Sequence, residues 1–391
     1  MPKASMVGIR RANPNTSNLI TVRILLYLVS TLCMTALLAQ GATAGDKAAL
    51  LALENWPEAQ TVEEIQGQAF TFASANPFTL ADVGSQARRR LGVRAAQAAE
   101  TTAAEPHSAQ GTLFLPETAS AEQPVPAVVL LHGARGVSRA REITYAKQFA
   151  AMGLAALVVD VFASRRDRAS SFTERLIEIT ESMALADAYG ALRALTAMPE
   201  IDGERIALIG FSYGGMTSLY AAHRQVADLY DQLLELEGKR FAAHVAFYAP
   251  CIVRFEDAKA TGAPLLMMWG DKDELIDRVR CESAASDLRQ GGAEVEIIVF
   301  PGAYHQWDGN LATPWRAPRG LRDCDFLVTK ENRTRGQVLG SLFSLSMTDT
   351  LSRKILLGMC SDSDGYLIGR DEAVRAQSNA ELSRFLGKAL R

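Results

Sequence analysis

The chain has 391 residues, of which 48% are hydrophobic and 22% are charged, as in an ordinary packed globular protein. This length suits one large α/β domain with additions, or two domains. A formal net charge of −3 argues against a nucleic-acid partner, because no basic excess is available to neutralise phosphates.

The first 44 residues have the pattern of a signal peptide. They contain four basic residues and no acidic residue: Lys3, Arg10, Arg11 and Arg23. An apolar run, Ile24–Ala39, follows, and the A-x-A pattern at Ala42 to Ala44 predicts cleavage before Gly45. The run is short for a membrane span, although an uncleaved anchor remains an alternative. We expect an exported protein, periplasmic or secreted, without stable membrane association, whose net charge changes from −3 to −7 when the leader is removed.

Four cysteines remain after this cleavage: Cys251, Cys281, Cys324 and Cys360. An even number in an oxidising compartment favours disulfides. Cys251 follows one predicted strand, and Cys281 lies just past the loop after the strand Leu265–Trp269, so adjacent strand ends would bring the two together. We therefore predict the pairs Cys251–Cys281 and Cys324–Cys360, with four buried free thiols as the alternative.

Residues 45–110 form an N-terminal segment before the main pattern begins. Gly45–Trp56 is predicted to be a short helix and Thr61–Ser74 a strand, and Ser85–Ser108, rich in alanine and arginine, is interpreted as a helical or mobile insertion. Gly111–Leu115 is a further strand, and residues 111–391 are interpreted as one domain that includes a C-terminal extension, 311–391.

From Pro126 onward, continuous apolar runs alternate with helical stretches. The six runs are Ala127–Leu131, Ala155–Val161, Ile206–Ile209, Val245–Tyr248, Leu265–Trp269 and Val295–Phe300. The stretches predicted as helices are Ile143–Met152, Arg175–Leu195, Met216–Leu236, Cys281–Gln290 and Ala373–Leu390. Strands buried on both faces have this composition, so we predict an α/β fold with a mainly parallel, doubly wound sheet of about eight strands and helices on both faces.

The stretch Arg205–Met216 contains the strongest motif, G-F-S-Y-G-G, between an apolar run and a predicted helix. This is the G-x-S-x-G pattern in its required strand–turn–helix context. Glycines two residues on either side of Ser212 allow a sharp turn that exposes its hydroxyl. The backbone N–H of Tyr213, at the start of the helix, would face an oxyanion formed there.

Ligands of such sheets bind beyond the carboxyl ends of the strands. The first apolar run is followed by His132-Gly133-Ala134-Arg135-Gly136, a turn whose Ala134 N–H is the predicted second oxyanion donor. His132 precedes the serine and is interpreted as structural. Arg135 is a candidate for binding an anionic substrate group, or simply a solvated side chain.

Two later strand ends supply the remaining candidates. Gly270-Asp271-Lys272-Asp273-Glu274 follows one strand, and its G-x-x-D spacing favours Asp273 as the histidine partner, with Asp271 and Glu274 expected to solvate the loop. His305 lies in the loop after the last run, where a neutral imidazole can accept the Ser212 proton while Asp273 fixes its tautomer. The order Ser212, Asp273, His305 is that of α/β-hydrolases.

Four stretches, A-V-V-L-L-H-G, I-D-G-E-R-I-A-L-I-G-F-S-Y-G-G, G-D-K-D and F-P-G-A-Y-H, give the chain a resemblance to the dienelactone hydrolase family of α/β-hydrolases. The resemblance covers about residues 111–305. It implies a Ser/Cys–His–Asp hydrolase acting on small-molecule esters or lactones, without a metal or an organic cofactor. The name-giving enzymes have a cysteine where this chain has Ser212 and an acid near His132-Gly133, so dienelactone specificity is not implied.

The sequence thus favours an exported serine hydrolase that cleaves carboxylic esters or lactones. The alternatives are a prolyl-oligopeptidase-like peptidase, an acyltransferase, and a hydrolase-fold protein that only binds a ligand. The extension 311–391 contains no recognisable chemistry; it either covers the site as a cap, with Trp307 and Trp315 lining a substrate pocket, or packs as ordinary surface. The sequence contains no indication of the oligomeric state.

Overall fold

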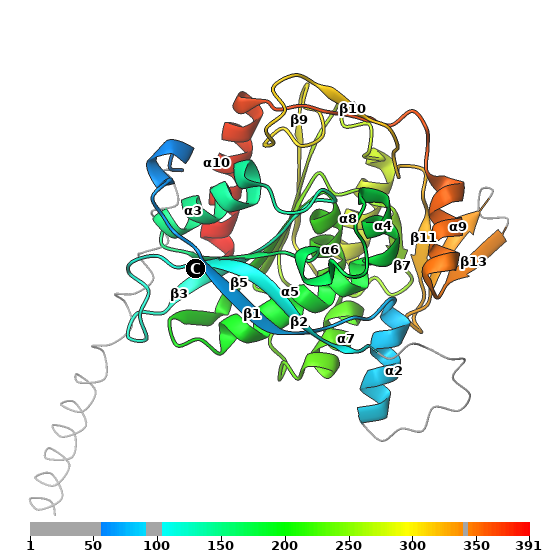
Figure 1. Cartoon of the computed structure of the whole chain (residues 1–391), viewed down its shortest axis with the longest axis horizontal. Helices are drawn as coiled ribbons and strands as arrows, with labels where there is room; N and C mark the ends of the chain where they lie inside the picture. Colours follow the sequence, from blue (N-terminus) through cyan, green and yellow to red (C-terminus); the bar gives the residue numbers. More distant parts are fainter. Residues whose placement is uncertain (1–55, 91–103, 339–342) are drawn as a thin grey trace, which may run out of the picture. The chain divides into compact units, whose positions relative to one another are not determined.

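An eight-stranded sheet forms the centre of the computed structural model, with strand order β1-β2-β4-β3-β5-β6-β8-β9 (Figure 1). Its strands are β1 (Gln68–Ala75), β2 (Pro106–Phe114), β3 (Val125–Leu131), β4 (Ala155–Val159), β5 (Ile201–Phe211), β6 (Ala243–Phe247), β8 (Leu265–Gly270) and β9 (Val295–Phe300). The strands from β4 to β9 in this order run parallel, and β2 pairs antiparallel with both β1 and β4. The predicted mainly parallel sheet of an α/β-hydrolase is confirmed.

The structure describes residues 56–90, 104–338 and 343–391. The predicted signal peptide, nearly all of the predicted helix Gly45–Trp56 and the centre of the stretch Ser85–Ser108 lie outside these residues. Within them, β1 is shorter than the predicted strand Thr61–Ser74, because a 3₁₀ turn, η2 (Ala59–Val62), occupies its first part. No helix in the described ranges has the length and apolar character needed to cross a membrane.

Helices cover both faces of the sheet. The helices that the structure describes are α2 (Leu80–Arg90), α3 (Thr144–Ala151), α4 (Phe172–Glu178), α5 (Glu181–Thr196), α6 (Tyr213–Ala221), α7 (Arg224–Leu234), α8 (Arg278–Gln290), α9 (Thr350–Cys360) and α10 (Glu372–Ala389); α9 lies in the C-terminal extension instead of against the sheet. Along β3, Val129 and Leu131 pack into the core beneath α5, α6 and α7, whereas Val128 and Leu130 pack toward α3 and α10. Alternate residues of one strand therefore serve two cores, which explains the continuous apolar runs in the sequence.

Two stretches predicted as single helices are each divided into two. The stretch Arg175–Leu195 is interrupted where Thr180 adopts an extended conformation and accepts a hydrogen bond from the Met183 N–H (3.4 Å), which caps α5. The stretch Met216–Leu236 is interrupted at His223, which is also extended, with φ −80° and ψ 130°. Neither interruption contains glycine or proline, so the sequence has no strong breaker at these points.

The C-terminal extension forms a second layer beside the main sheet. We call the described residues between 315 and 368 the cap; its elements are β10 (Trp315–Ala317), β11 (Phe326–Val328), β12 (Thr334–Val338), β13 (Phe343–Met347), α9 and β14 (Tyr366–Ile368). A short strand that follows β6, β7 (Val253–Phe255), pairs in parallel with β11 and so joins the cap to the hydrolase core. Figure 1 shows α9 and β13 in orange, with α9 close to α4.

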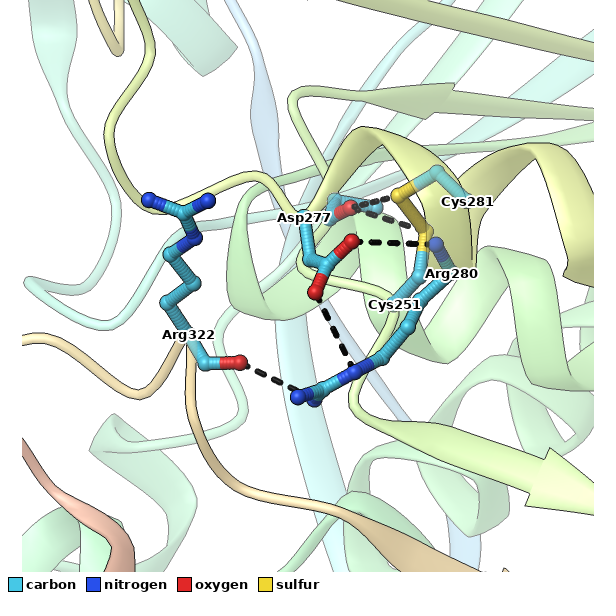
Figure 2. The surroundings of a disulfide bond; sticks show 6 residues. Cys251, Asp277, Arg280, Cys281 and Arg322 are labelled. Atoms are coloured by element: carbon cyan, nitrogen blue, oxygen red, sulfur yellow. Dashed lines mark hydrogen bonds and ion pairs between the residues drawn. A yellow bond between two sulfur atoms is a disulfide. The ribbon is translucent and has the colours of Figure 1, made fainter.

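Both predicted disulfides are present, Cys251–Cys281 and Cys324–Cys360. Arg280, beside the first disulfide, donates hydrogen bonds from Nη1 to the carbonyl oxygens of Arg322 (3.0 Å) and Cys324 (2.6 Å). Figure 2 shows this arginine reaching from α8 toward Arg322. The first disulfide is therefore connected through Arg280 to the segment that bears the second one, at the base of the cap.

Candidate active site

Ser212 occupies the tip of a sharp turn between β5 and α6. Its backbone has φ 53° and ψ −108°, a strained conformation for a residue with a side chain. A Cβ atom at Gly210 would lie 1.9 Å from the Gly214 carbonyl oxygen, and one at Gly214 would lie 2.3 Å from the Leu131 carbonyl oxygen. The two glycines are therefore sterically required, as the G-x-S-x-G pattern predicts.

Three side chains, from the segments that follow β5, β8 and β9, meet at this turn. His305 Nε2 lies 2.9 Å from Ser212 Oγ, and His305 Nδ1 lies 2.7 Å from Asp273 Oδ2. Because an ionised carboxylate can only accept, Nδ1 carries the proton and Nε2 is left to accept from the serine hydroxyl. The His305 and Asp273 side chains are completely buried. The structure thus brings together the three residues that the sequence analysis selected.

The loops that carry Asp273 and His305 are held by their neighbouring acids. Asp271 Oδ1 accepts a hydrogen bond from the Gly302 N–H (2.6 Å), just before the histidine. Glu274 Oε2 accepts one from the Leu367 N–H (2.9 Å) in β14, and the same side chain forms an ion pair with Arg316. Both acids are exposed, as expected for residues that solvate the loop, and each also holds a neighbouring segment through these contacts.

Two backbone N–H groups are placed beside Ser212. Tyr213 is the first residue of α6, where the N–H precedes the first intrahelical hydrogen bond. The turn that bears Ala134 passes directly against the serine, since a Cβ atom at Gly133 would lie 3.6 Å from Ser212 Cβ. Both Tyr213 and Ala134 line the same cavity as Ser212. This arrangement can stabilise negative charge on an oxygen bound next to the serine.

Comparison with known proteins gives the family of the part of the chain that bears this site. The Dienelactone hydrolase family profile matches residues 110–311, just over half of the chain. The chain belongs to the dienelactone hydrolase family. It is 24% identical to a Bradyrhizobium protein named as a probable 2-oxo-3-(5-oxofuran-2-ylidene)propanoate lactonase, over 49% of this chain and 77% of that protein. Other curated relatives match over only 39% to 42% of their own length.

Among solved structures, the chain is similar to a dienelactone hydrolase-like promiscuous phosphotriesterase from metagenomic libraries. That similarity has 16% identity and a TM-score of 0.48, and it covers 83% of this chain and 99% of the other. Esterase 2 of Thermogutta terrifontis is also similar, with 17% identity, a TM-score of 0.41 and coverage of 51% and 79%.

In this family member, Ser212 lines a cavity of about 530 Å³ that extends beneath the cap. Cap residues form a large part of its wall: Arg319, Leu321, Phe326, Val328, Thr334, Met347, Arg353, Lys354, Leu357, Gly358, Ser361 and Tyr366. Of the two alternatives for the C-terminal extension, a cap over the site and ordinary surface packing, these contacts favour the cap.

The two tryptophans and Arg135, which the sequence suggested as substrate-binding residues, do not line the cavity. Trp307 is fully buried in the core, where its Nε1–H donates to Ser378 Oγ (3.0 Å), so the expectation that it lines the substrate pocket is wrong. Trp315 is 41% exposed, and the Arg135 guanidinium lies 4.7 Å above its ring. Neither belongs to the cavity wall.

The ring contacts of His132 and the burial of two further histidines indicate structural roles. His132 donates from Nδ1 to the Gly133 carbonyl (2.8 Å) and accepts from the Val161 N–H at Nε2 (3.1 Å), which is the structural role expected for it. His223 and His244 are buried in the core. No group of three or more potential metal-ligating side chains occurs in the described ranges.

Two tyrosines beside His305 were not found from the sequence. Tyr248 and Tyr366 each pack edge-on against the imidazole, with ring centroids 4.8 and 5.0 Å away. The Tyr248 hydroxyl donates to Asp308 Oδ1 (2.7 Å), and burial raises the pKa of this aspartate. Tyr248 directly follows β6, and this position at a strand end is a weak indication of a site residue. Tyr366 lies in β14, whose strand partner β10 is distant in sequence, so no local pattern indicates it.

Proposed function

We propose that this protein is an exported serine hydrolase that cleaves carboxylic esters or lactones through an acyl-enzyme on Ser212. The observation that carries the proposal is the continuous hydrogen-bonded chain from Asp273 through His305 to Ser212, with distances of 2.7 and 2.9 Å, at the wall of a cavity. Membership of the dienelactone hydrolase family supports the same reaction class.

The first half of the reaction acylates the serine. As Ser212 Oγ bonds to the substrate carbonyl carbon, its proton passes to His305 Nε2, and the carbonyl oxygen takes the negative charge. The N–H groups of Tyr213 and Ala134 stabilise this oxyanion. Asp273 stabilises the imidazolium. When the C–O bond to the leaving group breaks, the departing alkoxide takes the proton from Nε2, and the acyl group remains on Ser212.

The second half releases the acid. A water molecule loses a proton to His305 Nε2 as its oxygen attacks the acyl carbon, and the same N–H groups hold the second oxyanion. Breakage of the bond to Oγ returns the proton to Ser212 and frees the carboxylic acid. In a lactone, the alcohol and the acid stay in one product.

Export is part of the proposal. The leader of residues 1–44 lies outside the described residues, so its support comes from the sequence pattern. The two disulfides add to this support, because such bonds persist in oxidising compartments.

The test is hydrolysis of a panel of p-nitrophenyl esters, lactones and aminoacyl anilides by the protein from Gly45 onward, beside Ser212→Ala. We expect ester or lactone hydrolysis that Ser212→Ala lowers by about a thousandfold or more. Preference for anilides would favour a peptidase, and transfer to an added alcohol in place of water would favour an acyltransferase. No turnover and no labelling of Ser212 by a fluorophosphonate would favour a protein that only binds its ligand.

A further inference from the structure

The cavity beside Ser212 is larger than a small lactone requires. Its volume of about 530 Å³ falls within the range of about 300–1,000 Å³ that is typical of sites for drug-sized molecules. The cavity extends from the turn that bears Ser212 to the cap. A substrate carbonyl at Ser212 therefore leaves most of the cavity volume for the rest of the substrate.

Apolar side chains form most of the cavity wall. They include Phe172, Leu176 and Met216 from the hydrolase core and Leu321, Phe326 and Leu357 from the cap. A polar ligand of this size would leave its own polar groups without hydrogen-bond partners against such a wall. An apolar ligand would instead gain stability by removing apolar surface from water.

The charges in the wall do not change this conclusion. Arg353 donates from both Nη atoms to the two carboxylate oxygens of Glu181 (2.9 Å each), and its Nε–H donates to the Leu176 carbonyl (2.9 Å). This buried arginine and its partner therefore neutralise each other. The other charged lining residues, Arg319 and Lys354, are exposed to solvent, where hydration satisfies their charges.

We propose that the substrates are esters with a long apolar group on one side of the scissile bond, and that this group occupies the cavity between the hydrolase core and the cap. The inference rests on the proposed function and specifies its substrate class. The cap, absent from the part of the chain that the family profile matches, supplies the wall that makes this group fit.

Helix α9 provides a place to test the inference. Gly358 lines the cavity and is exposed, and a Cβ atom added there would meet no atom within 4 Å. The neighbouring outer surface of the same helix is apolar, with Leu351, Ile355 and Met359 all exposed. Because Gly358 lines the cavity, we expect a large side chain at this position to take up space there, and its Cβ atom displaces no packed atom.

The experiment compares two ester series, p-nitrophenyl esters from acetate to octanoate and alkyl acetates from methyl to octyl. In at least one series we expect kcat/KM to rise with each methylene, by up to about fourfold per group that enters the cavity. Gly358→Phe should remove most of that rise, measured as the ratio of kcat/KM for the longest ester to that for the shortest. Met359→Phe is the control, because it also places a phenylalanine on α9, but at an exposed residue outside the cavity wall; it should keep the original profile.

Two results would overturn the inference: equal kcat/KM along both series, or an unchanged profile in Gly358→Phe. A binding measurement separates this failure from failure of the proposed function. Ser212→Ala protein should bind N-phenyl-1-naphthylamine, a neutral apolar fluorophore, and a second substitution, Gly358→Phe, should weaken that binding. If the protein hydrolyses no ester but binds the fluorophore, and Gly358→Phe weakens that binding, the proposed hydrolase function is refuted and the apolar binding site is retained. If the fluorophore does not bind, the apolar binding site is refuted.

Discussion

The backbone N–H of His305 donates a hydrogen bond to the carbonyl oxygen of Leu367, at 3.2 Å. The His305 carbonyl in turn accepts one from the Gly369 N–H, at 3.1 Å, so the histidine loop pairs with β14 like a short strand. The C-terminal extension, in which the sequence shows no chemistry, therefore holds the position of the proposed general base.

Glu274, in the loop that bears Asp273, connects this loop to β14. Its carboxylate accepts a hydrogen bond from the Leu367 N–H and forms an ion pair with Arg316. Glu274→Ala should lower kcat/KM by about tenfold, because small displacements of a catalytic group are costly. Glu274→Gln keeps an acceptor for the Leu367 N–H and should recover part of the loss. Glu294→Ala, which removes an exposed carboxylate paired with Lys388, is the control. Activity of Glu274→Ala equal to that of Glu294→Ala would contradict a positioning role.

Position 210, in the turn that bears Ser212, should not accommodate a side-chain methyl group. Because an added Cβ would lie 1.9 Å from the Gly214 carbonyl oxygen, Gly210→Ala should lower the free energy of unfolding by about 3 kcal/mol. Urea denaturation measures this change. Gly358→Ala, with no atom within 4 Å, should be neutral or slightly stabilising, and equal stability of the two variants would refute the steric argument.

Two buried histidines make stability depend on pH. Burial lowers the pKa of His223 and of His244 from 6.5 to about 3. As the pH falls below 6.5, the unfolded chain binds protons that the folded chain does not take up until about pH 3, so stability falls through this window. In this window each histidine lowers the free energy of unfolding by up to about 1.4 kcal/mol for each pH unit of acidification.

The variant His244→Leu tests this account. Neither ring nitrogen of His244 has a hydrogen-bond partner among the described residues, so the substitution should cost little at pH 7.5. It should also reduce the loss of stability between pH 6.5 and 4.5, because one proton-binding group has been removed. Urea unfolding at several pH values gives both quantities. A slope identical to that of the unsubstituted protein would show that His244 is not buried in its neutral form.

The disulfide Cys324–Cys360 closes a segment with a sequence separation of 36 residues within the cap. Replacing both cysteines with serine should lower the free energy of unfolding by about 4 kcal/mol, because the unfolded chain regains the entropy of the open loop. Denaturation under oxidising conditions measures the effect. Equal stability of the double variant and the unsubstituted protein would contradict a stabilising role for this bond.

Local sequence patterns were sufficient to predict the turn that bears Ser212 and the positions of Asp273 and His305. The glycines around Ser212 are dictated by contacts within a few residues, and Asp273 and His305 follow buried strands that parallel pairing places side by side. The cap is different, because β7 pairs with β11, about seventy residues later, and strands of three residues leave no periodic signal.

The position of Trp307 also depends on tertiary packing. A tryptophan in a loop two residues after the histidine suggests a pocket wall, yet its ring packs against Tyr248 and Phe300 at centroid distances of 4.9 and 5.3 Å. Burial of this kind is decided by the strand ends and α10 together. It could not be read from the loop sequence alone.

The most direct test of the central claim is mass spectrometry of the protein after reaction with a fluorophosphonate. The account predicts a single covalent adduct on the peptide that contains Ser212, no adduct in Ser212→Ala, and much slower labelling in His305→Ala, because the hydroxyl has lost its base. An adduct on another residue, or an unlabelled Ser212 in protein that hydrolyses esters, would contradict it.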